Sequence, residues 1–311
     1  MLPRHDDLVL CRIPFPIEET EADDGSYAGV YVNPGSPCSV HVPFDAARFR
    51  AWRALMHRAE RRGHDDDELV TMFTGPQAGP LAHGLACGTH LAVHNRVPWN
   101  EVGPVYHDYE QDVEVLRESW DVTDRRGWLE QLTYLLRGEN SPRHPELALR
   151  VRRALPGGRV DPERWRELAV AEVRRISDDA RDAAAVRDVV GRILRYESRF
   201  RADGLLAADG PGSVVVSALA YDYGRAVNFA RWGLGARFAG QRETEDAVVR
   251  AGELAREVYG SWAEFSAGYV LGRVLRFDDE SFGHMYGSAV RPHEILTTHP
   301  ESPWRSMPFR T

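Results

Sequence analysis

The side chains best suited to binding or catalysis lie in one short segment at positions 221–232. Its sequence is Tyr-Asp-Tyr-Gly-Arg-Ala-Val-Asn-Phe-Ala-Arg-Trp. At about 100° per residue of a helix, Asp222 falls among apolar residues, and Arg225 lies at the edge of the same face. A carboxylate on an apolar face needs a partner, and Arg225 is one helical turn away. The favoured interpretation is a buried ion pair that determines how helices pack.

The same run also permits a binding site, and this alternative stays open. Arg225, Asn228 and Arg231 can together recognise an anionic group, with Tyr221 and Trp232 as walls. Such a site would suit an enzyme that acts on an anionic or phosphorylated small molecule. Arg231 projects well away from Arg225 on a helical wheel, which weakens the alternative.

Four side chains with metal-ligand chemistry, His83, Cys87, His90 and His94, recur at helical spacing and would share one face of a single helix. His90 and His94, at i and i+4, can hold zinc, but a third ligand must come from elsewhere. The motif H-E-x-x-H is absent because Leu91 occupies the position of the general base. The pattern therefore favours a packed helix without a cofactor, and a bound metal is the weaker alternative.

All 39 basic residues of the chain are arginines, against 47 acidic residues, so the formal net charge is −8. Without lysine the chain cannot form a Schiff base, and it lacks the lysine that contacts nucleotide phosphates in P-loop NTPases and in protein kinases. These three classes of protein are therefore excluded. The negative net charge argues against a nucleic-acid partner. No G-x-S-x-G motif and no G-x-G-x-x-G motif after a strand is present. These exclusions favour a protein without catalytic activity of its own.

The middle and the C-terminal part of the chain read as successive helices, which predicts a mainly α fold. Thr123 is the expected cap of one helix, and Asp161-Pro162 begins another. A capping box at Ser261–Glu264 begins the last one. Between them we expect helices over Ser177–Phe200, Ser217–Gly233 and Glu243–Tyr259. The prolines after Gly287 predict an irregular tail on the surface.

The first 75 residues differ from the rest. Short β-type runs at Tyr27–Val32 and Ser39–Val42 flank a proline-glycine turn, which predicts a hairpin. A helix follows after Asp45, and the acidic run Asp65–Asp67 is either the first turn of the next helix or a weak metal site. We therefore divide the chain into an N-terminal extension, 1–75, and a helical domain, 76–311.

The cellular setting follows from three weak signals. The three cysteines form no paired spacing, as is usual in a reducing compartment. The N-terminus lacks the basic and apolar regions of a signal peptide. The apolar stretches are too short to span a bilayer. We therefore expect a cytoplasmic protein with no membrane partner, and an arginine-rich, lysine-free composition typical of GC-rich bacteria such as actinobacteria.

Several motifs occur in the order found in one known family. YDYGRAVNFARWG is followed by SWAEFSAGYVLGR and SPWRSMPF, and the segment Leu116–Leu136 precedes them. Over roughly residues 81–309 the chain resembles the bacterial domain-of-unknown-function family 1266 (DUF1266). It departs from the pattern at Gly138-Glu139-Asn140, where the family has Gly-His, and at Arg276-Phe277, where the family has tryptophan.

The resemblance implies a mainly helical bacterial domain, and it assigns no activity, cofactor or catalytic residue. It singles out six residues that bind, catalyse or pack: Asp222, Arg225, Arg231, Trp232, Trp262 and Arg273. Together with the residue patterns, it favours a cytoplasmic helical binding or interaction module, with a protein partner or a homo-oligomer as its expected association. The alternative is the enzyme described above, with or without the assistance of a metal held by His90 and His94 or by Asp65–Asp67. A third class is a component of a bacterial toxin or immunity system.

Overall fold

The computed structural model describes residues 18–21, 27–32, 39–44, 67–72, 75–102, 109–155 and 161–310, with side chains from residue 67 onward except 109–111. Three strands, β1 (Glu18–Glu21), β2 (Tyr27–Val32) and β3 (Ser39–Phe44), pair antiparallel in the order β1-β2-β3. The turn that the hairpin prediction requires lies outside the described residues, and so does the helix expected after Asp45. Both stay predictions.

The predicted mainly α class is confirmed, because helices make up most of the described part of the chain beyond the strands. They are α2 (Gly79–Cys87), α3 (Thr89–His94), α4 (Tyr109–Trp120), α5 (Arg125–Arg137), α6 (Arg143–Arg153), α7 (Pro162–Arg174), α8 (Ala180–Ala202), α9 (Ala220–Gly235), α10 (Gln241–Val258), α11 (Trp262–Phe277), α12 (His284–Thr298) and α13 (Pro303–Ser306). None of the described helices combines the length and apolar character needed to cross a bilayer.

Local capping decides where several helices begin. Asp161 caps α7 by accepting hydrogen bonds from the two backbone N–H groups that follow Pro162. Ser261 caps α11 by accepting from the backbone N–H of Glu264, as the capping box predicts. For α5 the expected cap is wrong by one position, since Asp124 and not Thr123 accepts from the first turn. Both side chains are able to cap a helix, so the sequence alone did not separate them.

The single helix expected through His83 and His94 is not formed, because the chain turns at Gly88 between α2 and α3. At this break the carbonyl of Ala86 accepts from the side chains of Thr89, at 2.7 Å, and Trp304, at 3.1 Å. Helix α9 also packs close to the break: a Cβ atom on Gly88 would lie 2.6 Å from the Val227 side chain. The four metal-ligand side chains therefore do not share a helix face.

The irregular C-terminal tail was also a wrong prediction. Helix α12 continues through Pro292, and α13 follows it. Proline removes one helical hydrogen bond, but Pro292, Val290 and Leu296 are buried, and this apolar burial offsets the loss. Trp304 and Phe309 are buried too, so the tail belongs to the core and does not lie loosely on the surface.

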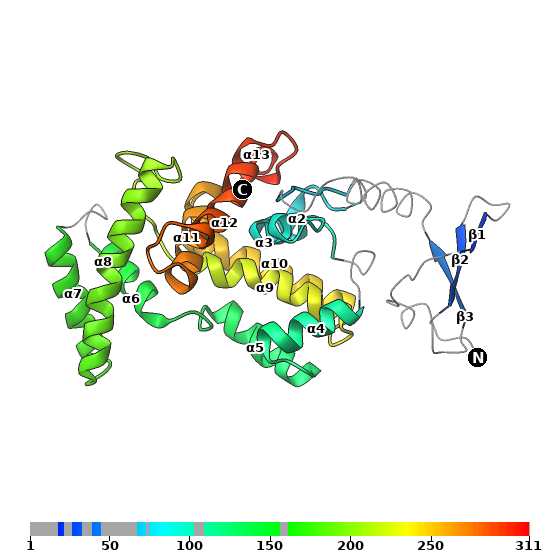
Figure 1. Ribbon diagram of the computed structural model, residues 1–311, viewed down its shortest axis with the longest axis horizontal. Helices are drawn as coiled ribbons and strands as arrows, with labels where there is room; N and C mark the ends of the chain where they lie inside the picture. The colour runs from blue at the N-terminus through cyan, green and yellow to red at the C-terminus, as the bar shows by residue number, and fades with distance from the viewer. Residues whose placement is uncertain are drawn as a thin grey trace.

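The described helices enclose two hydrophobic cores that share α11. One core surrounds α9, in which every residue except Trp232 is buried, and the other lies among α6, α7 and α8. Phe265 and Tyr269 of α11 belong to the first core, whereas Val270 and Val274 belong to the second. Figure 1 shows α6–α8 on one side of α11, and α2–α5 on the other.

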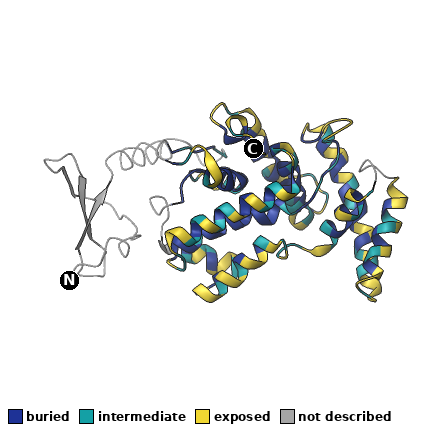
Figure 2. Ribbon diagram, turned by 180° about the vertical axis from the view of Figure 1, so that it is seen from behind, coloured by how far each residue is buried: buried dark blue, intermediate teal, exposed yellow. Residues whose placement is uncertain are grey.

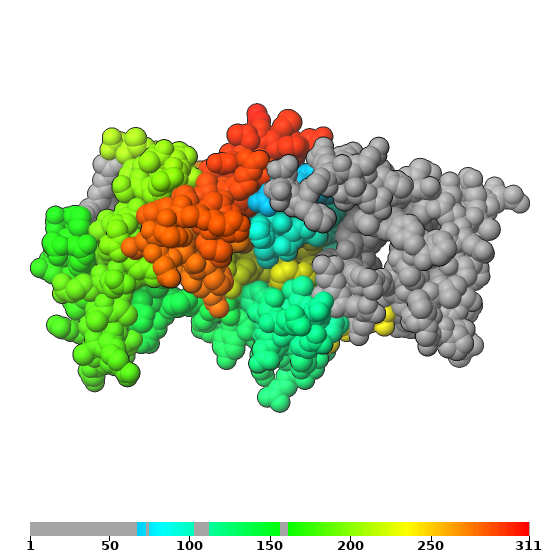
Figure 3. Space-filling view, viewed as in Figure 1, coloured from blue at the N-terminus to red at the C-terminus, as the bar shows by residue number. Residues whose placement is uncertain are grey.

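Burial across this arrangement follows the usual amphipathic pattern. Surrounding helices expose one face and bury the other, as Figure 2 shows for α7 and α8. In the space-filling view, the orange residues of α11 and α12 lie between the green α7–α8 and the cyan α2–α3 (Figure 3). The junction of the two cores is therefore the place where residues distant in sequence meet.

Candidate functional site

A cavity of about 220 Å³ lies at this junction, between the α5–α6 linker and helices α6, α8, α9 and α11. Its apolar lining includes Pro142, Pro145, Ala185, Val189, Leu219 and Leu275. Its polar lining comprises Ser141, His144, Glu146, Asp188, Arg192, Asp222 and Arg276. Some of these residues are exposed, so the cavity reaches the surface. An apolar hollow with a few polar groups is the usual form of a small-molecule site.

Asp222 forms part of the cavity wall and binds the α5–α6 linker. Its Oδ1 atom accepts from the hydroxyl of Ser141 at 2.6 Å, and its Oδ2 atom accepts from the backbone N–H of Ser141 at 3.0 Å. Arg225 forms an ion pair with Oδ1. The carboxylate is fully buried, so these three contacts replace the hydration that it loses.

The guanidinium of Arg225 is enclosed by groups of the chain itself. It lies 3.9 Å from the ring centroid of Tyr221 and 5.4 Å from that of Trp120. It also donates to the hydroxyl of Ser141 at 3.2 Å and to the carbonyl of Tyr221 at 3.3 Å. Arg225 is buried and does not itself line the cavity. Its contacts stabilise Asp222 and Ser141, which do line it.

The linker can turn sharply because α5 ends at a glycine. Gly138 has φ +67°, in the left-handed region that favours glycine, and a Cβ atom there would lie 2.3 Å from the Leu219 side chain. Glycine therefore lets the linker adopt this left-handed turn and approach Leu219 closely before it reaches Ser141. These three residues all line the cavity.

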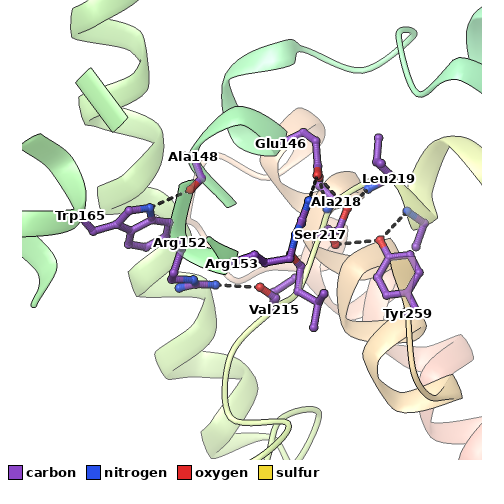
Figure 4. Close-up of polar contacts among 12 residues, drawn as sticks. Glu146, Ala148, Arg152, Arg153, Trp165, Val215, Ser217, Ala218, Leu219 and Tyr259 are labelled. Atoms are coloured by element: carbon purple, nitrogen blue, oxygen red, sulfur yellow. Dashed lines mark hydrogen bonds and ion pairs between the residues drawn. The ribbon is translucent and has the colours of Figure 1, made fainter. Parts of the chain in front are cut away.

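The segment before α9 is held by Glu146 of α6, as Figure 4 shows. Glu146 accepts from the hydroxyl of Ser217 at 2.6 Å and from the backbone N–H of Ala218 at 3.0 Å, and it pairs with Arg153 at 2.7 Å. The hydroxyl of Tyr259 donates to the carbonyl of Ser217 at 2.9 Å. Burial raises the pKa of Tyr259 well above its usual value, so this phenol keeps its proton.

A second buried ion pair holds the same segment and was not identified from the sequence. Arg152 and Glu197 form two hydrogen bonds, at 2.6 and 3.0 Å, and both also bond the backbone of Val215. The Arg152 guanidinium stacks 4.2 Å from the ring centroid of Trp165. A signal was present, since Glu197 follows Ile193 by four residues on the buried stripe of α8. Only packing places α6 against it.

The other polar residues that line the cavity differ in how many hydrogen bonds and ion pairs they form within the chain. His144 contacts Asp182, with 3.0 Å between Nε2 and Oδ1. Arg192 donates to the carbonyls of Leu275 and Asp278 at 3.1 and 3.4 Å. Asp188 and Arg276 are exposed, and neither makes an ion pair within the described part of the chain.

Most of the predicted site residues lie away from the cavity. Arg231 donates to the carbonyl of Pro98 at 2.8 Å, and Asn228 donates to that of Gly88 at 2.9 Å. Trp232 is half-buried and packs near Trp120, with ring centroids 6.4 Å apart. Of the eight residues predicted as ligand contacts, Asp222 alone is among those lining this cavity. The predicted anion site is not assembled around it.

Trp262 and Arg273 belong to other contacts. Trp262 stacks on Trp304, with ring centroids 5.5 Å apart, and donates to the carbonyl of Met307 at 2.8 Å. Arg273 donates to Ser288 at 3.3 Å. Both residues of the family motifs therefore contact other parts of the chain and do not line the cavity.

The two histidines of the weak metal prediction face different partners. His90 Nε2 lies 2.9 Å from Ser266 Oγ, which in turn lies 2.8 Å from His293 Nδ1. His94 Nδ1 lies 3.5 Å from Asp67 Oδ1. Within the described ranges, no three histidine, cysteine, aspartate or glutamate side chains are grouped to hold a metal ion. Residues 65 and 66 of the acidic run lie outside the described residues.

Comparison with known proteins identifies a family for this chain but assigns it no activity. A family model with the description "Protein of unknown function (DUF1266)" matches residues 115–309. The match confirms the resemblance inferred from the motifs, although it begins later than residue 81. No curated protein and no solved structure matches the chain significantly.

Proposed function

The chain belongs to the DUF1266 family, and we propose that it is a binding module that holds a small molecule in the cavity between α6, α8, α9 and α11. One observation carries the proposal: partly buried polar contacts from both cores build the cavity wall. Asp222 holds the linker on one side, and Glu146 holds the segment before α9 on the other. A wall fixed in this way is pre-organised, which lowers the entropic cost of binding.

The size of the cavity limits its occupant. A volume of about 220 Å³ lies below the roughly 300–1,000 Å³ that is typical of sites for drug-sized compounds. The cavity volume is also far larger than the roughly 10–15 Å³ that is needed to hold one water molecule. The expected ligand is therefore a compound about as large as an amino acid.

Binding without catalysis is supported by the state of the reactive groups. The Ser141 hydroxyl donates to a carboxylate that is itself paired with Arg225. The Cys87 thiol is buried, and burial raises its pKa, so it is not a thiolate at neutral pH. An enzyme acting on an anion is less well supported, because Arg225 and Arg231 already bond groups of the chain.

The finer parts of the proposal rest on composition. A cytoplasmic location and a bacterial source fit the sparse cysteines and the lysine-free sequence. A protein partner, a homo-oligomer, or a place in a toxin or immunity system is compatible with a small-molecule-binding module. Bacterial gene neighbourhoods would distinguish the last of these.

The test uses a matched pair of cavity variants. Ala185 lines the cavity and is half-buried, whereas Ala184 is exposed on the same helix and does not line it. Ala185→Phe should fill the cavity, and Ala184→Phe adds the same ring to the surface. A library of small metabolites is screened against the full chain by thermal shift and ligand-detected NMR.

We expect compounds that bind the wild type and Ala184→Phe but not Ala185→Phe. Circular dichroism and thermal melts establish that each variant is folded, and Ala185→Leu replaces the larger substitution if that one fails to fold. The proposal is wrong if no compound binds, or if all compounds that bind the wild type also bind the filled variant equally well.

A further inference from the structure

Two charges of opposite sign line the cavity from facing elements without being paired to each other. Asp188 projects from α8 and Arg276 from the C-terminal end of α11, and both side chains are exposed. In the part of the chain that the structure describes, neither has an ion-pair partner within 4.0 Å. Asp188 acts electrostatically on Arg195, which forms its own ion pair with Glu280 at 2.7 Å.

The absence of a pair at Asp188 has a structural cause. Arg192 stands one turn further along α8, at the i+4 spacing that usually supports an ion pair. Its guanidinium is turned toward the end of α11, where it donates to the carbonyls of Leu275 and Asp278. It also lies 3.5 Å from Glu280. Arg192 thus joins α8 to α11 and leaves the Asp188 carboxylate available to a ligand.

Apolar residues adjoin the two charges. Ala185 and Val189 lie beside Asp188 on α8, and Leu275 precedes Arg276 on α11. Leu219 contributes to the same lining from the segment before α9. A ligand that contacts both charges must therefore have an aliphatic part that these side chains can cover.

We infer that the ligand is a small aliphatic zwitterion, such as an amino acid or a dipeptide. Its ammonium group pairs with Asp188 and its carboxylate with Arg276, whose planar guanidinium suits a carboxylate. A compound with one charge satisfies only one of the two groups. The other charged lining residues, Glu146, Arg192 and Asp222, are already bonded within the chain. This inference rests on the proposed function, because it assigns the chemical class of the ligand in the same cavity.

The experiment compares compounds that differ by one charge. L-leucine is the reference zwitterion; 3-methylbutylamine lacks its carboxylate, and 4-methylpentanoate lacks its ammonium group. Glycyl-leucine carries both charges at a greater separation. Each compound is titrated by isothermal calorimetry into the full wild-type chain and into Asp188→Asn and Arg276→Gln. The controls are Asp246→Asn and Arg242→Gln, which neutralise exposed charges on α10.

We expect at least one zwitterion to bind roughly tenfold more tightly than either single-charge analogue. Asp188→Asn should remove the advantage over 4-methylpentanoate, and Arg276→Gln should remove the advantage over 3-methylbutylamine. The control variants should bind as the wild type does. Both substitutions affect exposed side chains, so the fold should be preserved.

Four results would overturn the inference. A single-charge analogue that binds as tightly as both zwitterions contradicts it, and so does an unchanged zwitterion affinity in both cavity variants. The third result is that neither zwitterion binds, while other compounds bind the wild type and are lost in Ala185→Phe. In that case the cavity is a binding site with a different ligand, and the proposed function survives. If no compound binds at all, both proposals fail.

Discussion

The hydroxyl of Ser141 donates to Oδ1 of Asp222 across 2.6 Å, although 81 positions separate the two residues. This bond joins the α5–α6 linker to the first turn of α9. The ion pair between Asp222 and Arg225 therefore does more than hold two neighbouring positions of one helix. Because the carboxylate also accepts from the linker, it stabilises one wall of the cavity.

Asp222→Ala should lower the free energy of unfolding by about 3–5 kcal/mol. The substitution leaves the buried guanidinium of Arg225 without its carboxylate and removes both bonds to Ser141. Urea denaturation followed by circular dichroism measures the change. Asp246→Ala, at an exposed position on α10, is the control and should change stability by less than about 0.5 kcal/mol. A comparably small loss for Asp222→Ala would contradict the structural role of the pair.

Ser141→Ala should have a smaller effect, about 1–2 kcal/mol, since the backbone bond to Asp222 remains. A double-mutant cycle with Asp222→Ala isolates the contribution of the hydroxyl bond. We expect a coupling energy of about 1 kcal/mol from denaturant unfolding. Strictly additive effects would mean that the linker is not held by this bond.

Arg152→Met should destabilise the protein by about 3–5 kcal/mol, because it leaves the buried Glu197 carboxylate without its ion-pair partner. The matched control is Arg250→Met, which removes an exposed pair with Glu253 on α10. Exposed pairs contribute about 0–1 kcal/mol. Chemical denaturation of both variants should therefore give clearly different midpoints, and equal midpoints would show that burial of the first pair does not matter.

Stability should decrease as the pH falls from about 6.5 toward 4. Burial lowers the pKa of His83 and of His293 from 6.5 to about 4, and it holds the pKa of His90 well below its usual value. The unfolded chain therefore binds more protons than the folded chain within this window, so acidification favours unfolding. Well above pH 6.5 all three histidines are neutral in both states, so this contribution to stability becomes constant only there. Thermal melts between pH 7.5 and 5 measure the dependence.

The variant His293→Gln separates the histidine contribution from that of other groups. Glutamine does not titrate, so the dependence between pH 6.5 and 5 should become shallower than in the wild type. His284→Gln removes an exposed histidine and should leave the slope unchanged. A slope unaffected by the first substitution would mean that His293 does not contribute to the acid sensitivity.

Much of the helical framework could be predicted from the sequence because its signals are local. Asp161 with Pro162, and Ser261 with Glu264, begin helices through contacts within a few residues. The buried pair of Asp222 and Arg225 was also predictable, since the partners are one turn apart on the same helix. Apart from the cap of α5, the wrong expectations about the helices concern where a helix is interrupted. Whether a chain turns at Gly88 or continues through Pro292 depends on what packs against it.

The cavity was decided by the tertiary structure alone. Ser141 and Asp222, Arg152 and Glu197, and the series His90, Ser266 and His293 each join residues on different elements. Periodicity states which face of a helix is apolar, but it does not state which other helix covers that face or at what angle. Sequence by itself determined the helical class, the starts of α7 and α11, and one buried ion pair. Packing between remote helices determined where polar groups converge, and hence where a ligand can bind.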